Sequence, residues 1–229
     1  MRPIEIELAY AQSRAVSLFD AIRERGLITN GHTESEISEA IRELAAREFG
    51  VEAHWHKRLV RSGPNTRLPF RANPPDRMVE RDDIVSIDLG PVFGAYEADF
   101  GRTFVLGDDP EKLRLRDDLA RMFAHGRDFY LARPSMTGAE LYEEIVRASA
   151  ERGWGFGGAH AGHLVDAFPF AFEARAAAKN RIHPDNDVPM SAPDERGRAR
   201  QWILEIHLLD PTGAFGGFFE ELLVPVRAS

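Results

Sequence analysis

The pattern of hydrophobic and polar residues predicts four helices, two near the N-terminus and two in the middle of the chain. Two of them open at capping boxes, Thr33-Glu34-Ser35-Glu36 and Thr137-Gly138-Ala139-Glu140, in which the Thr and the Glu three residues later can each bond to the other's backbone. Asp109 followed by Pro110 opens another. The expected helices cover about residues 5–25, 33–49, 110–131 and 137–152.

The strands that the sequence predicts are short and separated by loops. They are expected at 58–63, twice within 83–106, and at 201–209 and 215–226. The Pro-rich loop GPNTRLPFRANPPDR follows the first strand, and a loop of this length in a compact domain is more often functional than idle. The segment GWGFGGAHAGHLVDAFPF is expected to be irregular, and residues 176–200 to form a polar surface loop.

The order of these elements repeats loosely, as helices followed by a hairpin, twice. We therefore expect a single α+β domain over residues 1–229. Its two related halves, about 1–109 and 110–229, would surround one mixed, mainly antiparallel sheet.

Composition narrows the chemistry further. The 229 residues are 43% hydrophobic and 29% charged, which is typical of a soluble globular protein. No apolar run is long enough to cross a bilayer, and the first residues lack the apolar core of a signal peptide, so we expect a cytoplasmic protein without a membrane partner. The absence of cysteine excludes disulfides, zinc fingers and cysteine nucleophiles, and leaves His, Asp and Glu as metal ligands.

The formal net charge of −8 argues against nucleic acid as a partner, because neutralising phosphates requires a basic face. The local exception is HWHKRLVR, from His54 to Arg61, which we interpret as a solvated strand edge.

A carboxylate pair on the predicted hairpin within 83–106 points to a metal. A two-residue turn at Phe93-Gly94 would pair each position i with 187 − i, so Asp88 would face Asp99. Opposed like charges destabilise a sheet, and more so when half-buried, so a chain that places them there is expected to supply a cation. The alternative is a different register with one Asp facing solvent.

The last hairpin repeats this arrangement. A turn at Thr212-Gly213 pairs i with 425 − i, so Glu205 faces Glu220, although Gly216-Gly217 could carry a bulge that shifts the register by one. Two hairpins with facing carboxylates between apolar neighbours favour a metal site. An imidazole among the ligands would shift the preference toward Mn²⁺, Fe²⁺, Co²⁺ or Zn²⁺. His163, in the Gly-rich AGHLV, is the candidate; the alternative is a core or surface histidine.

This pattern resembles the pita-bread metallopeptidases, the family of methionine aminopeptidase, aminopeptidase P and prolidase. Their ligands are Asp, Asp, His, Glu and Glu in that order. The two Asp are eleven positions apart on a hairpin, and the His lies in a Gly-His motif. The matching residues here are Asp88, Asp99, His163, Glu205 and Glu220. The resemblance extends from about residue 5 to 226 and lacks the N-terminal domain of prolidases, so it implies a catalytic domain alone.

The resemblance implies a pita-bread fold and two divalent ions (Mn, Co, Fe or Zn) that bind and deprotonate a bridging water. The hydroxide would attack a peptide carbonyl near the N-terminus of a small peptide substrate, with Glu205 carrying the proton to the leaving amine. The expected activity is that of an aminopeptidase or an X-Pro dipeptidase-like enzyme. Family members without an extra domain are monomers or dimers, and we expect a homodimer.

Two positions depart from the family. Its members have a histidine seven residues after the ligand His and another about eighteen residues before the first Asp, where this chain has Phe170 and Phe70. Those imidazoles contact the substrate and the tetrahedral intermediate, and losing such a group typically costs about 10²–10³ in rate. Phe70 and Phe170 would make the substrate pocket apolar. The alternatives are a non-peptide C–N substrate, or binding without turnover.

Other histidines could compensate. His207 lies two residues after Glu205, so on a strand it points to the same face and could supply a catalytic imidazole; the alternative is a partner that orients a ligand carboxylate. His160 is expected to be structural or to support a ligand, and His54 and His56 could approach the pocket rim. A kinase is rejected despite Asp99-Phe100-Gly101, because the other kinase motifs are missing, and no Gly-x-Ser-x-Gly motif supports a serine hydrolase.

Overall fold

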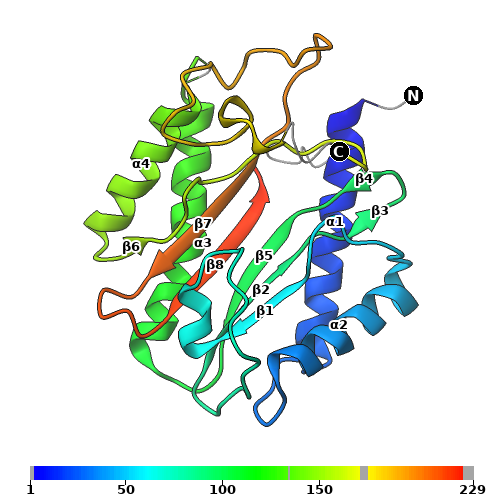
Figure 1. The fold of residues 1–229 in the computed structure, drawn as a ribbon, viewed down its shortest axis with the longest axis vertical. Coiled ribbons are helices and arrows are strands. Elements are labelled where there is room, and N and C mark those ends of the chain that lie inside the picture. Colours follow the sequence, from blue (N-terminus) through cyan, green and yellow to red (C-terminus); the bar gives the residue numbers. More distant parts are fainter. Residues whose placement is uncertain (1–2, 134, 171–174, 224–229) are drawn as a thin grey trace.

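A computed structural model of the chain describes residues 3–133, 135–170 and 175–223 (Figure 1). The N-terminal elements are α1 (Ile4–Glu24), α2 (Glu34–Phe49), β1 (Leu59–Ser62), η1 (Gly63–Arg67), β2 (Ile84–Leu89), β3 (Val92–Phe93), β4 (Tyr96–Glu97) and β5 (Phe100–Val105). The C-terminal elements are α3 (Pro110–Leu131), α4 (Gly138–Glu151), β6 (Gly155–Phe156), η2 (Ala178–Asn180), β7 (Ile203–Leu209) and β8 (Gly216–Leu222). Helices followed by a hairpin thus occur twice along the chain. The division into two related halves near residue 109 stays a prediction.

The local signals for the helix starts are confirmed. Thr33 and Thr137 each accept from the backbone N–H three residues later, and Glu36 and Glu140 each accept from the backbone of their Thr, so both capping boxes are formed. Asp109 caps α3 through the backbone N–H groups of the first turn. These bonds satisfy amide donors that have no partner inside the helix.

The strands form a six-stranded sheet in the order β1-β2-β5-β8-β7-β6, with β3 and β4 in a separate small hairpin. All strand pairs among the described residues are antiparallel, which confirms the α+β class with a mainly antiparallel sheet. The four central strands, β2, β5, β8 and β7, come from two segments that are far apart in the sequence, 84–105 and 203–222 (Figure 1). This brings the two predicted carboxylate hairpins side by side.

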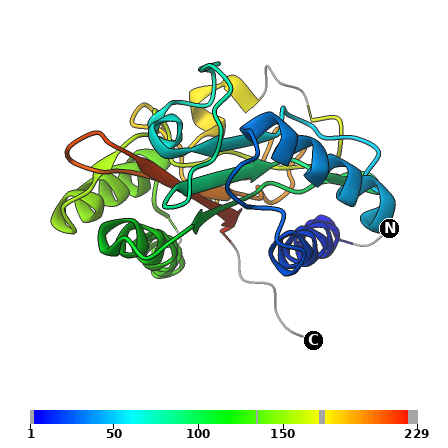
Figure 2. The same cartoon turned by 90° about the horizontal axis from the view of Figure 1, so that it is seen from below.

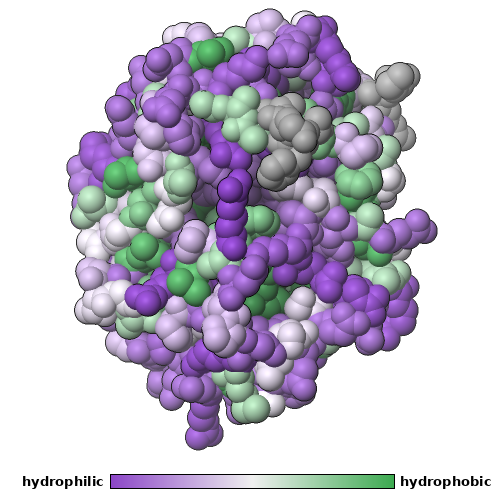
Figure 3. All heavy atoms as spheres, in the orientation of Figure 1, coloured by the Kyte–Doolittle hydropathy of each residue, from purple (hydrophilic) through white to green (hydrophobic). Residues whose placement is uncertain are grey.

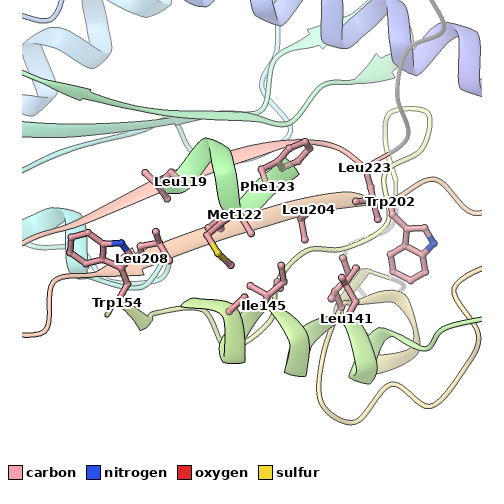
Figure 4. Close-up of a cluster of buried hydrophobic side chains, with 14 of the residues drawn as sticks. Leu119, Met122, Phe123, Leu141, Ile145, Trp154, Trp202, Leu204, Leu208 and Leu223 are labelled. Carbon is pink, nitrogen blue, oxygen red and sulfur yellow. The ribbon is translucent and has the colours of Figure 1, made fainter. Parts of the chain in front are cut away.

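Helices cover one face of the sheet. In Figure 2, α1 and α3 lie on the same side, and the loop that contains η1 lies on the other. Side chains of α3, α4 and β7 interlock in the larger core (Figure 4). Its members in that view include Leu119, Met122, Phe123, Leu141, Ile145, Trp202, Leu204 and Leu208. Since Leu204 and Leu208 point into this core, the alternate side chains of β7 point to the opposite face.

Two predicted segments differ from the structure. The Gly-rich segment after α4 contains a short strand, β6, that pairs with β7 at the sheet edge, where we expected irregular structure. Its two residues are too few to show a period-2 pattern. The last predicted strand, 215–226, forms β8 up to Leu222, and residues 224–226 lie outside the described part of the chain.

The face of the molecule in Figure 3 is largely hydrophilic, with smaller hydrophobic patches between the polar groups. Within the described residues, no helix combines the length and the apolar character that a bilayer crossing requires.

Candidate metal centre

Three carboxylates stand in one row across the four central strands. Asp88 on β2 pairs with Gly101 on β5, Gly101 pairs with Glu220 on β8, and Glu220 pairs with Glu205 on β7. Residues opposite one another in a sheet point to the same face, so these side chains share one surface of the sheet. It is the face away from α3, because Gly217, three residues before Glu220 on β8 and therefore on the opposite face of the strand, lies against Leu115 and Leu119 of that helix.

The predicted register of the last hairpin is confirmed. Glu205 faces Glu220, and Leu209 faces Gly216, as a turn at Thr212-Gly213 requires. The Gly216-Gly217 bulge that we considered is not formed.

The predicted register of the first hairpin is wrong by two residues. Asp88 faces Gly101 instead of Asp99, because the two-residue turn lies at Gly94-Ala95 and not at Phe93-Gly94. Gly94 has φ +64°, and a tight hairpin needs a positive φ at its first central position, which favours glycine there. A shift of two preserves the alternation of side chains, so Asp99 still belongs to the face that carries Asp88.

His163 reaches this row from the Gly-rich segment. The φ of Gly162 is +138°, and a Cβ there would lie 2.0 Å from the carbonyl oxygen of Ile203, so only glycine lets the segment run this close to β7. The Nε2 atom of His163 lies 3.3 Å from Asp99 Oδ2 and 3.6 Å from Glu205 Oε1. Its Nδ1 donates to the carbonyl of Leu164 at 2.8 Å, which turns Nε2 toward the carboxylates.

His56, which the sequence predicted only near the rim of the pocket, lies in the centre itself. Its Nε2 lies 3.2 Å from Asp99 Oδ1 and 3.4 Å from Asp88 Oδ1, and its side chain is only 6% exposed. The solvated-edge interpretation of HWHKRLVR is therefore correct only in that β1 is an edge strand, since both His56 and Arg61 have buried side chains. The spacing of His54 and His56 is that of a strand, and it does not predict that His56 contacts the carboxylates of the neighbouring hairpin.

Burial changes the proton affinity of these carboxylates. It raises the pKa of Asp88 and of Glu205 to about 7 each, and raises the pKa of Glu220 well above its usual value. Burial also raises the pKa of Asp99, but hydrogen bonds from His163 and His56 outweigh it and hold that pKa below its usual range. The charges of Asp88 and Asp99 raise the pKa of His56 to about 9 against the opposing effect of burial.

The donor set fits divalent cations. Two groups, His56-Asp88-Asp99 and Asp99-His163-Glu220, each offer three ligand atoms within 4.8 Å of one another, and Asp99 belongs to both. Asp88 Oδ1 and Glu220 Oε2 are buried without a hydrogen-bond partner among the described residues. Buried carboxylate oxygens without a donor are costly unless a cation satisfies them. Glu205, next to Glu220 and His163, is placed to complete the set.

The other two predicted histidines lie in different surroundings. His207 points to the carboxylate face, but its Nε2 donates to the carbonyl of Thr66 in η1 at 2.9 Å, and its catalytic role stays a prediction. His160 lies closer to the centre, with Nδ1 3.5 Å from Glu205 Oε1. Burial lowers the pKa of His160 to about 3, which keeps this imidazole neutral.

The two phenylalanines of the predicted pocket come from different loops. Phe70 is 46% exposed, and its ring lies edge-on to His56 with ring centres 5.6 Å apart. Phe170 packs at the edge of the main core, with the Arg175 guanidinium 5.0 Å from its ring centre. Arg175 also pairs with the buried Glu97. Phe70 therefore borders the centre directly; a contact of either ring with substrate stays a prediction.

A buried arginine holds the Pro-rich loop beside the centre. The guanidinium of Arg61 donates to the carbonyl of Leu68, and to those of Pro69, Phe70 and Ala72 at 3.0, 3.3 and 2.9 Å. One side chain thus holds four residues of the loop, between Leu68 and Ala72, through their backbone carbonyls.

Comparison with known proteins agrees with this geometry. The model of metallopeptidase family M24 matches residues 7–190. Xaa-Pro dipeptidases of Pyrococcus furiosus and Pyrococcus horikoshii are 32% and 30% identical over 128 residues, which is 56% of this chain and 36% of each relative. The matched segment thus spans about a third of the length of these relatives. The family match ends before Glu205 and Glu220, whose place in the site rests on the strand register.

Solved structures share the fold. X-Pro aminopeptidase from Thermotoga maritima superposes with a TM-score of 0.74 and 22% identity, over 99% of this chain and 62% of that one. Prolidase from Pyrococcus furiosus does so with a TM-score of 0.71 and 23% identity, over 98% and 64%. The match of the family model over most of the chain and these superpositions together show that the chain belongs to metallopeptidase family M24 and has its pita-bread fold.

Proposed function

We propose that this chain is a dinuclear metal-dependent hydrolase that cleaves small peptides near the N-terminus, as an aminopeptidase or an X-Pro dipeptidase-like enzyme. The observation that carries the proposal is the carboxylate of Asp99, shared by two groups of ligand atoms. A carboxylate that belongs to both groups can bridge two neighbouring ions. The names of the relatives, Xaa-Pro dipeptidase and X-Pro aminopeptidase, support an X-Pro peptide as substrate.

The residues that would hold the ions are Asp88, Asp99, His163, Glu205 and Glu220. Mn²⁺, Co²⁺, Fe²⁺ and Zn²⁺ all suit such a ligand set, so the concentration of each metal in the cell would decide which one is bound. The ions would supply Lewis-acid polarisation of the scissile carbonyl and activation of water. A cytoplasmic location and a homodimer remain our expectations.

Glu205 is the group to which we assign proton transfer to the leaving amine. Its Oε1 atom lies 3.6 Å from His163 Nε2 and 3.5 Å from His160 Nδ1, so two imidazoles flank this carboxylate. Holding a general acid in place is part of what makes it effective. His160 stays neutral at Glu205, so it can orient the carboxylate without adding a charge. Phe70 would give the entrance an apolar surface that suits an apolar residue of the substrate.

The test measures metal content and turnover together. The protein is purified without chelator and assayed with Mn²⁺ against Met-, Pro- and X-Pro-peptides. Two ions per chain with turnover of one peptide class support the proposal, whereas no binding of Mn²⁺ or Co²⁺ even in excess would remove it. Glu205→Gln should lower the rate about 10²–10⁴-fold. The matched control is Glu221→Gln. Glu221 lies on the neighbouring strand β8, on the sheet face opposite to the carboxylates, and pairs with Arg102.

A second function is favoured by one observation, the exposed phenylalanine at position 70 beside the centre. Without the imidazoles that the family has at positions 70 and 170, the site would suit a non-peptide C–N bond, or binding without turnover. Two bound ions with no turnover of any peptide would support this alternative.

A further inference from the structure

We propose that His56 is a second imidazole ligand, so that each of the two ions is bound by one histidine on either side of Asp99. This inference deepens the proposed function and rests on its dinuclear centre. The ligand set that the resemblance supplies contains one histidine, His163, and nothing in it assigns a role to His56.

The first argument is the matched geometry of the two imidazoles. His56 Nε2 lies 3.2 Å from one oxygen of Asp99, and His163 Nε2 lies 3.3 Å from the other. A carboxylate whose two oxygens each face an imidazole nitrogen is arranged as a bridge between two centres. Each nitrogen also faces a second carboxylate, Asp88 for His56 and Glu205 for His163.

The second argument is the tautomer that the backbone imposes. His56 Nδ1 lies 2.6 Å from the carbonyl of Lys57, as His163 Nδ1 lies 2.8 Å from the carbonyl of Leu164. A carbonyl oxygen can only accept, so both histidines carry a proton on Nδ1 and the lone pair of a neutral ring is on Nε2. Histidines that bind metals commonly have their other ring nitrogen bonded in this way.

The third argument is that the fold holds His56 in place. Residues 53–55 run along residues 90–92 through backbone bonds from Trp55 N–H to Gly90 O (2.9 Å) and from Val92 N–H to Ala53 O (3.0 Å). The indole of Trp55 donates to Ala98 O at 3.0 Å. These bonds tie the segment before His56 to both strands of the Asp88-Asp99 hairpin.

Gly90 makes the approach possible. A Cβ at this position would lie 2.3 Å from His56 Cδ2 and 2.5 Å from the Trp55 indole nitrogen. Any larger residue would therefore push the imidazole away from Asp88, two residues earlier on the chain. The glycine after the metal-binding strand is needed for the position of His56, and not for a turn.

A second imidazole has a chemical consequence. Nitrogen ligands favour the later divalent metals over Mg²⁺ and Ca²⁺, so two histidines shift both ions toward Co²⁺ and Zn²⁺. The two metal sites of this centre should accordingly differ less from each other in metal preference than the two sites of a centre that has only one histidine ligand.

The test uses Co²⁺ on the full-length chain, after removal of metals with a chelator. Calorimetric titration gives stoichiometry and affinity, and proton NMR shows the strongly shifted N–H protons of histidines that bind the paramagnetic ion. We expect two equivalents and two such exchangeable signals. In His56→Gln one signal should disappear, and one equivalent should bind at least about tenfold more weakly. His163→Gln should remove the other signal, and the neighbouring control His54→Gln should keep both.

Each outcome has a distinct meaning. No Co²⁺ binding to the wild-type protein overturns the proposed function itself. Two equivalents with a single shifted signal, or two signals that both persist in His56→Gln, overturn the role of His56 alone. Should His56→Gln fail to fold, Gly90→Ala removes no ligand atom but displaces the ring, and it should lose the same signal.

Discussion

The facing carboxylates Glu205 and Glu220 predict that one substitution stabilises the metal-free protein while it abolishes function. Their Cβ atoms are on directly opposed positions of β7 and β8, about 5 Å apart in such pairs. Two unit charges at that distance would repel by about 3 kcal/mol at an effective dielectric constant of 20; the raised pKa of Glu220 relieves this by proton uptake, which itself costs free energy as the pH rises. Glu220→Gln removes this repulsion without changing side-chain volume. We expect the metal-free variant to unfold about 2–8 °C above the wild-type protein, for a gain of about 1–2 kcal/mol.

The sign of the pH dependence follows from the raised pKa values. Burial raises the pKa of Glu220, and those of Asp88 and Glu205 to about 7, so the metal-free folded state binds protons more tightly than the unfolded state. The free energy of unfolding therefore falls as the pH rises from about 4.5 toward 7 and above. The advantage of Glu220→Gln over the wild-type protein should accordingly be larger at pH 8 than at pH 5.

Differential scanning calorimetry with chelator and with Mn²⁺ tests both statements. With excess Mn²⁺ the order should reverse, because an ion at a hundred times its Kd adds about 2.7 kcal/mol per site to the wild-type protein. Glu221→Gln is the control, since Glu221 pairs with Arg102 and its loss should not raise the melting temperature. A metal-free Glu220→Gln protein that melts below the wild-type protein would refute the reasoning.

Three further substitutions have defined outcomes. Phe70→His should raise kcat/KM on X-Pro peptides, by up to about 10²-fold if it restores a contact with the intermediate, and an unchanged value would count against that role. Gly162→Ala should destabilise the fold by more than about 2 kcal/mol in urea titration, because of its positive φ and the carbonyl of Ile203 at 2.0 Å from a Cβ. His207→Ala should keep its metal content but lose activity; full activity would exclude a catalytic role for His207.

Much of the fold could be predicted from the sequence, because its signals are local. A capping box needs only four consecutive residues, and the helices that open at Thr33 and Thr137 begin where expected. The last hairpin was registered correctly because the loop between its strands, residues 210–215, is centred on Thr212-Gly213, where the turn was expected. The first failed at Gly94, where the positive φ decided which residue comes first in the turn.

The site could be predicted only as far as it lies on paired strands or on a recognisable motif. His56 belongs to neither, since its place depends on backbone bonds to residues 90–92 and on the absence of a side chain at Gly90. Arg61 was missed for a similar reason. Its charge suggested solvent, whereas its partners are carbonyls up to eleven residues later in a loop whose path the sequence does not define.

Because of the bonds from Arg61, the path of the Pro-rich loop does not depend on the side chains of the bonded residues. All four acceptors, from Leu68 to Ala72, are backbone carbonyls, which every amino acid has. A substitution at position 70 would therefore change what lines the entrance without releasing the loop. Replacement of a single residue can therefore exchange an imidazole for a phenyl ring in this wall, so the selectivity of the entrance can change while the path of the loop stays the same.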